Sequence, residues 1–187
     1  MRWRSAAPSA PIGVDLGARH IQAAQVREGR LRGSACWPRG APGAALTPTD
    51  IREIARSVAQ GPFDGRTLVV FVPGSQVMTG VLELPPRSSG APIEQLARAE
   101  LARRHGLPAD SVEVACWDLP SPARAANRTY VMAVGGRRDY LNGLVDGFES
   151  AGFRVRALDV RALAVSRACR RLLLESEGTG AILDVDW

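Results

Sequence analysis

The sequence contains no lysine, so arginine supplies all 24 of its strongly basic side chains. With 19 acidic residues the formal net charge is +5. Arginine binds phosphate well, which makes a nucleic acid or a lipid surface one interpretation of this excess. The arginines are instead spread along the chain and interleaved with acids, a pattern typical of a solvated surface. We therefore expect no nucleic-acid partner.

Cysteine and histidine are also scarce. The three cysteines, Cys36, Cys116 and Cys169, are widely spaced and form no Cys-x-x-Cys pair. This spacing excludes a disulfide framework and a zinc site of the usual kind, and it fits a reducing compartment such as the cytoplasm. Nothing in the order of residues links either histidine, His20 or His105, to a nucleophilic serine or cysteine. We therefore predict no Ser-His-Asp or Cys-His arrangement.

Long hydrophobic runs are missing as well. No stretch approaches the ~20 apolar residues that a membrane helix needs, so we expect no direct membrane insertion. Residues 1–10 carry two arginines but no apolar core, which does not fit a secretory signal and predicts a short disordered lead. Hydrophobic residues make up 45% of the chain, which is ordinary for a globular protein and enough to bury a core.

The first half of the chain predicts an antiparallel meander. Three short strands, Ile12–Leu16, His20–Val26 and Leu31–Trp37, are separated by tight turns. Apolar residues at helical spacing then predict a helix over 51–58 with Thr49-Asp50 at its start, and a strand follows over 68–72. A meander before the first helix is unlike a Rossmann domain, which alternates strand and helix from its first strand.

The second half predicts a small α+β insertion followed by a return to the first sheet. The expected elements are a strand over 77–84, a helix over 93–104, strands over 112–119 and 130–134, a helix over 139–150, a strand over 153–158, a helix over 161–174 and a strand over 180–185. We therefore predict an α/β protein in which residues 11–75 and 155–187 form one subdomain and residues 76–154 form an inserted one.

The stretch Gly13-Val14-Asp15-Leu16-Gly17 is the best candidate for chemistry. It places a carboxylate at a strand end, directly before a glycine turn into the next strand. Backbone N–H groups in such a turn can bind phosphate oxygens, and the carboxylate can hold Mg²⁺ through water. The same residues also fit a plain hairpin with a surface aspartate, and both interpretations stay open.

This hairpin resembles the first phosphate loop of the actin-like ATPases, and the whole chain from Pro11 onward resembles the first half of the PilM-type proteins of type IV pilus assembly. The stretches that carry the resemblance are 13–17, 70–75, 82–86, 97–100, 131–134, 139–152, 155–164 and 181–185. The resemblance implies an actin-like ATPase (ribonuclease H-like) subdomain with a small α+β subdomain inserted in it.

The resemblance also implies a function. It points to a cytoplasmic component of type IV pilus or type II secretion-like assembly that binds ATP and Mg²⁺ when full length. Its partners would be the tail of a PilN-like membrane protein and other inner-membrane pilus components. The implied nucleotide-binding residues are Asp15, Gly17, Ala18, Arg19, His20 and Asp184, with Asp15 and Asp184 holding the metal through water.

A groove for the partner's tail is implied at Val77, Met78, Val81 and Leu82, where an extended strand edge with apolar flanks suits peptide docking. An internal sheet edge is the alternative interpretation of the same residues.

The chain departs from the family pattern at the nucleotide site. Ala18, Arg19 and His20 stand where the family has small hydroxyl residues, and Asp186 stands where the second phosphate loop needs glycine. The chain also supplies one of the two lobes that enclose the nucleotide in this fold. We therefore do not expect ATP turnover by this chain alone, and its status as an enzyme stays open. The alternatives are a sugar kinase-like fragment of the same superfamily and a degenerate scaffold without nucleotide.

Overall fold

A computed structural model describes residues 9–44, 46–120, 128–170 and 181–183. The chain divides into two compact units. Unit 1 comprises residues 1–46, 53–74 and 152–187, and unit 2 comprises residues 47–52 and 75–151. Of the strand predicted over 180–185, residues 181–183 are described and form no strand, whereas Asp184 lies outside the described residues.

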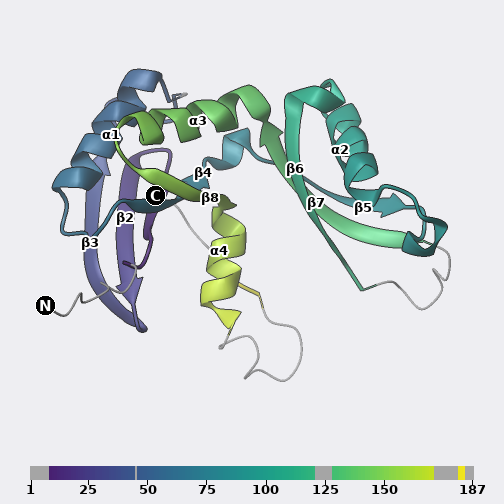
Figure 1. The fold of residues 1–187 in the computed structure, drawn as a ribbon, viewed down its shortest axis with the longest axis horizontal. Coiled ribbons are helices and arrows are strands. Elements are labelled where there is room, and N and C mark those ends of the chain that lie inside the picture. The colour runs from purple at the N-terminus through teal and green to yellow at the C-terminus, as the bar shows by residue number, and fades with distance from the viewer. Residues whose placement is uncertain (1–8, 45, 121–127, 171–180, 184–187) are drawn as a thin grey trace, which may run out of the picture. The chain divides into compact units, whose positions relative to one another are not determined.

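Unit 1 is built on a five-stranded sheet with the order β3-β2-β1-β4-β8 (Figure 1). Its strands are β1 (Ile12–Leu16), β2 (His20–Arg27), β3 (Arg30–Pro38), β4 (Thr67–Val72) and β8 (Arg154–Val160). The first three strands form the predicted antiparallel meander. β4 then lies parallel to β1, and β8 lies parallel to β4. This arrangement brings the ends of β1, β4 and β8 to the same edge of the sheet.

One face of this sheet is buried. The residues that alternate along β1 and β4 on this face are at most 6% exposed: Ile12, Val14, Leu16, Leu68, Val70 and Val72. In the same unit, Ile54, Ala55 and Val58 form the buried stripe of helix α1 (Pro48–Gln60), at the three- and four-residue spacing that predicted the helix.

The start of α1 differs from the prediction. The Asp50 N–H donates to Thr47 Oγ1 at 3.2 Å, and the Thr47 N–H donates to Asp50 Oδ2 at 2.7 Å. Thr47 therefore caps the helix, rather than Thr49 with Asp50. The reason is Pro48, which suits the first helical position because it has no N–H to satisfy there.

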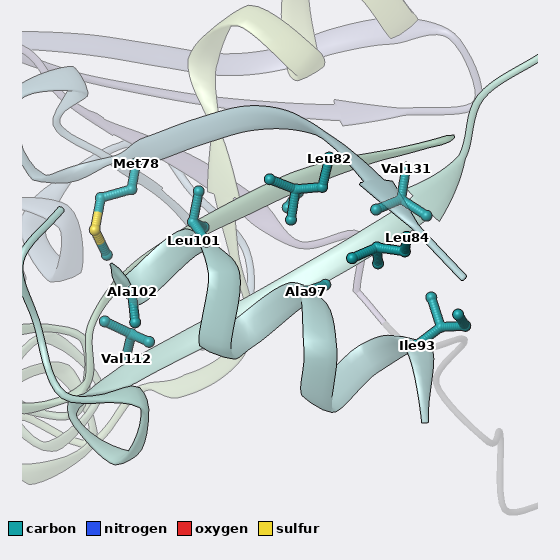
Figure 2. Close-up of a cluster of buried hydrophobic side chains, with 10 residues drawn as sticks. Met78, Leu82, Leu84, Ile93, Ala97, Leu101, Ala102, Val112 and Val131 are labelled. Carbon is teal, nitrogen blue, oxygen red and sulfur yellow. The ribbon is translucent and has the colours of Figure 1, made fainter. Parts of the chain in front are cut away.

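Unit 2 contains an antiparallel three-stranded sheet with the order β5-β7-β6 and helix α2 (Ile93–Arg104) on one of its faces (Figure 2). The strands are β5 (Met78–Leu84), β6 (Val112–Asp118) and β7 (Thr129–Arg137). The 3₁₀ turn η1 (Gly74–Gln76) precedes β5, η2 (Arg87–Ser89) lies between β5 and α2, and η3 (Ala109–Ser111) lies between α2 and β6. The core between α2 and the sheet comprises Met78, Leu82, Leu84, Ile93, Ala97, Leu101, Ala102, Val112, Val131 and Ala133.

Two further helices follow the strands. In α3 (Arg138–Ser150), Leu144 and Phe148 are fully buried. A Cβ on Gly147 would lie 2.6 Å from Ile51 Cγ2, so the absence of a side chain there lets α3 pack closely against the first turn of α1. Helix α4 (Arg161–Ala168) follows β8 in unit 1. No helix in the described ranges is long and apolar enough to span a membrane.

Candidate functional site

The hairpin between β1 and β2 presents the predicted phosphate turn. β1 ends at Leu16, directly after Asp15, and β2 begins at His20. A Cβ on Gly17 would lie 2.6 Å from the backbone oxygen of His20, so the turn has no room for a side chain at this position. Ala18, Arg19 and His20 are exposed, whereas Asp15 is half-buried. The geometry therefore explains why glycine stands at the first position of this turn.

The loop after β3 fixes the same turn from one side. The Arg39 N–H donates to the backbone oxygen of Arg19 at 2.8 Å, and the Gly43 N–H donates to that of Ala18 at 2.8 Å. The Arg39 guanidinium reaches the backbone oxygen of Gly17 at 3.3 Å. The three successive backbone carbonyls of residues 17–19 thus each accept a hydrogen bond from this loop. The sequence gives no signal for this role of Arg39, because a glycine- and proline-rich loop predicts no particular contact.

Asp15 belongs to a row of residues that crosses the whole sheet of unit 1. It pairs with Gln22 on β2 and with Phe71 on β4, and Phe71 pairs in turn with Asp159 on β8. Residues directly opposite each other share a face of the sheet. Two carboxylates, Asp15 and Asp159, therefore lie on one face with Phe71 between them.

Helix α4 supplies an arginine to each of these carboxylates. Arg161 Nε lies 3.7 Å from Asp15 Oδ2. Arg167 pairs with Asp159, whose other oxygen accepts the backbone N–H of Val160 at 2.7 Å. The two acids on this face of the sheet are therefore each accompanied by a positive charge.

A cavity of about 980 Å³ opens on the same face of unit 1. Strand residues such as Asp15, Val69 and Phe71 line one side of it, and α4 residues such as Arg161 and Val165 line the other. Of the described residues that line the cavity, Asp15 and Arg161 alone are charged. Among these described lining residues the formal charges balance, and most of the residues are apolar.

The described residues do not fit a magnesium site at Asp15. In the part of the chain that the structure describes, no three His, Cys, Asp or Glu side chains gather in a way that could hold a metal ion. The carboxylate of Asp15 already faces the guanidinium of Arg161, and Mg²⁺ prefers an octahedron of oxygen ligands. Asp184, the other predicted ligand, lies outside the described residues.

A second region of interest is the face of the unit 2 sheet that points away from α2, called here the open face. Strand alternation places Val81, Tyr130, Met132, Val134, Ala115 and Trp117 on it. Val81, Met132 and Trp117 stand directly opposite one another across the three strands. Val81 is 49% exposed and Trp117 is 39% exposed. An apolar row therefore crosses the open face and meets solvent at both ends.

Two arginines next to the unit 2 sheet bond to its outer strands, β6 and β5. Arg87 forms a bidentate pair with Asp118 at the end of β6, with Nη2 2.7 Å and Nε 2.8 Å from the two carboxylate oxygens. The hydrogen bonds from Arg87 lower the pKa of Asp118 below its usual range. At the β5 edge, Arg104 Nη1 donates to the backbone oxygen of Val81 at 3.1 Å. Because this oxygen bonds to a side chain, Val81 directs its backbone groups away from β7.

Residues 13–185 match the family of the type IV pilus assembly protein PilM. The chain belongs to the PilM family. No curated protein sequence matches the chain. The match to this family covers the hairpin, the three-stranded sheet and α4.

Solved structures support the same fold for this PilM-family chain. The PilM–PilN type IV pilus biogenesis complex is 19% identical, with a TM-score of 0.72 over 88% of this chain and 51% of that one. The cytoplasmic domain of EpsL, an inner-membrane component of the type II secretion system of Vibrio cholerae, is 19% identical, with a TM-score of 0.54 over 79% of this chain and 56% of that domain. This chain thus spans about half the length of both. The predicted α/β fold of the PilM type is confirmed.

Of the groove residues predicted for this PilM-family chain, those on β5 fall on two faces of the sheet. Met78 and Leu82 are 8% and 0% exposed and belong to the core under α2. Val81 lies on the open face, and Val77 is half-buried just before β5. The period of two in a strand could have separated these side chains from the sequence alone. It could not have shown that Met132 and Trp117 join Val81, because the register between strands is a long-range property.

Proposed function

We propose that this PilM-family chain is the docking part of a cytoplasmic component of type IV pilus or type II secretion-like assembly. The segment that it docks is an N-terminal, cytoplasmic peptide of a PilN-like membrane protein. The observation that carries the proposal is the open face of unit 2, where an apolar row is 49% and 39% exposed at its two ends. Exposed apolar patches of this kind typically mark interaction sites.

The chemistry of the open face favours an extended peptide with apolar side chains at alternate positions. Three strands present the valine, the methionine and the tryptophan of the row side by side, and such a surface accepts one face of an extended segment. Methionine adapts its shape to a partner, and tryptophan contributes a large apolar area. Arg104 already occupies the backbone oxygen of Val81 at the β5 edge, so we place the peptide across the face rather than along that edge.

The resemblance to PilM proteins and the complex of PilM with PilN support this choice of partner. Binding of ATP by a longer form of the protein is also part of the proposal. What supports it is the hairpin turn, which lacks room for a side chain at Gly17 and is held by Arg39.

Peptide binding tests the docking proposal. A fluorescein-labelled N-terminal peptide of the PilN-like protein from the same organism is titrated with the chain, and fluorescence anisotropy is measured. We expect saturable binding, and we expect Val81→Asp to weaken it at least about tenfold, because a carboxylate covered by an apolar contact must be desolvated. Leu31→Asp is the matched control, because Leu31 is 62% exposed on β3 of unit 1 and should not affect binding.

Two outcomes would contradict the proposal. One is the absence of binding at high peptide concentration. The other is equal binding by the wild-type chain and the Val81→Asp variant, provided that circular dichroism shows that both are folded. If Leu31→Asp alone weakened binding, the peptide site would instead lie on unit 1.

A further inference from the structure

The ion pair between Arg161 and Asp15 lies at the one carboxylate that the hairpin offers to a metal ion. The two side chains come from different parts of the chain, the end of β1 and the first residue of α4. Arg161 Nε lies 3.7 Å from Asp15 Oδ2, with 36% of the arginine side chain and 24% of the aspartate side chain exposed. We propose that Arg161 is the resident counter-charge of Asp15 and that the chain takes no divalent cation at this carboxylate.

The electrostatics of the cavity support this assignment. A half-buried carboxylate needs compensation, and a guanidinium provides it without any ion from solution. A divalent cation beside Asp15 would be attracted by one negative charge and repelled by the adjacent positive charge of Arg161. Asp15 and Arg161 are the charged residues among the described lining of the cavity, so no other described residue of that lining is an acid that offsets this repulsion.

The attachment of α4 supports the same conclusion. The second pair, between Arg167 and Asp159, ties the other end of the helix to the neighbouring part of the sheet. The two pairs together keep α4 on the face of the sheet that carries Asp15. Arg161 is therefore held beside the carboxylate by the fold, rather than only by the flexibility of its own side chain.

This inference concerns the metal at the hairpin and does not depend on the proposed peptide docking. Its failure would leave the peptide titration unaffected, and loss of peptide binding would leave the charge pair in place. If it holds, any phosphate contact at the turn is made by backbone groups and arginine without a metal bridge through Asp15.

Binding of Mn²⁺ to the chain without nucleotide tests the proposal. Mn²⁺ is titrated with the chain, and the relaxation rate of water protons reports the bound ion. We expect the wild-type chain and Asp15→Asn to give the same titration. We expect Arg161→Ala to gain affinity for Mn²⁺ on the order of tenfold, because one repulsive charge at about 4 Å is removed. Asp15→Asn in the Arg161→Ala background should remove the gain.

Two variants control for charge and fold. Arg161→Lys keeps the positive charge and should show no gain in Mn²⁺ affinity. Arg156→Ala removes an equal charge at an exposed position of β8 and should also show none. The proposal is overturned if the wild-type chain binds Mn²⁺ and Asp15→Asn abolishes that binding, or if Arg156→Ala raises the affinity as much as Arg161→Ala.

Thermal unfolding gives a second, independent readout of the pair. We expect Asp15→Asn and Arg161→Gln each to lower Tm by about 1–3 °C, and the double variant to be no less stable than the worse single variant. Strictly additive shifts would show that the two side chains do not interact and would overturn the proposal.

Discussion

The two sheets of the molecule each have one buried face, but their second faces differ in chemistry. In unit 1 the second face carries two carboxylates, and α4 supplies an arginine to each of them. In unit 2 the second face carries a row of valine, methionine and tryptophan that remains partly exposed. A half-buried charge needs a partner within the fold, because its desolvation is costly. An apolar face can remain open, so it is available to a second molecule.

The largest expected effect is a difference in stability between substitutions on the two faces of the unit 2 sheet, at the neighbouring β5 residues Leu82 and Val81. Leu82 is fully buried under α2, whereas Val81 is 49% exposed on the open face. Leu82→Ala should lower the free energy of unfolding by about 2–5 kcal/mol, because it removes apolar contacts and leaves a cavity. Val81→Ala should lower it by less than about 1 kcal/mol. Urea unfolding followed by circular dichroism measures both.

The contrast between the two faces would be contradicted if both substitutions lowered the free energy of unfolding by the same amount. A large loss for Val81→Ala would mean that the open face is already covered within the chain, so that it could not serve as a docking surface. A small loss for Leu82→Ala would mean that the core under α2 relaxes around the missing side chain.

The next largest effect concerns a buried polar side chain of unit 1, Gln25, which hydrogen-bonds to backbone groups. Gln25 is 2% exposed; its side chain donates to the backbone oxygens of Ala10 and Asp64 at 2.7 Å each and accepts the Asp64 N–H at 2.9 Å. Gln25→Leu should lower the free energy of unfolding by about 1–3 kcal/mol, because these backbone groups lose their partner. Gln22→Leu is the matched control: Gln22 is an exposed residue of the same strand, and the expected change is below about 0.5 kcal/mol.

Equal effects of the two glutamine substitutions would contradict this account of unit 1. They would show that water replaces the amide of Gln25 at no cost, and that the buried polar contacts of this unit do not specify its fold.

Local patterns predicted most of the fold. Short apolar runs located β1 and β4, helical spacing located α1 and α2, and the glycine turn located the hairpin. The cap of α1, which is Thr47 rather than Thr49 with Asp50, is a local failure. The other main failures involve contacts between residues far apart in the sequence. Gln25 occupies a buried strand position because the backbone of residue 64 lies beside it, and no local pattern shows this.

The same reason explains what was missed at the candidate site. The sequence singled out Asp15 and Gly17, since a carboxylate beside a glycine turn is a local motif. Arg161 lies far from Asp15 in the sequence, and only the parallel strands β1, β4 and β8 bring the two together. Arg39 likewise reaches the turn from a loop that has no periodic pattern. Sequence reasoning thus finds the groups that could do chemistry but not the groups that neutralise or hold them.

The smallest expected effect tests the charges of unit 2, which lie on a helix surface instead of beside a cavity. Glu100 accepts hydrogen bonds from Arg103 at 2.8 Å and from Arg104 at 3.0 Å, and these bonds lower its pKa to about 2. Because the pKa in the folded state lies below that in the unfolded state, the stabilisation is fully present above about pH 4.5 and is lost as the pH falls towards 2. Pairs of this kind contribute less than about 1 kcal/mol.

Urea midpoints at pH 6, 4 and 2.5 measure this contribution for the wild-type chain and for Glu100→Gln. We expect the wild-type chain to be slightly more stable at pH 6 and the difference to shrink at pH 2.5, where the carboxylate begins to bind a proton. Glu149→Gln, at an exposed position of α3, should show a smaller difference at every pH. A difference that persists unchanged at pH 2.5 would mean that Glu100 acts through packing, and the contrast between internally paired charges in unit 1 and solvated charges in unit 2 would lose its support.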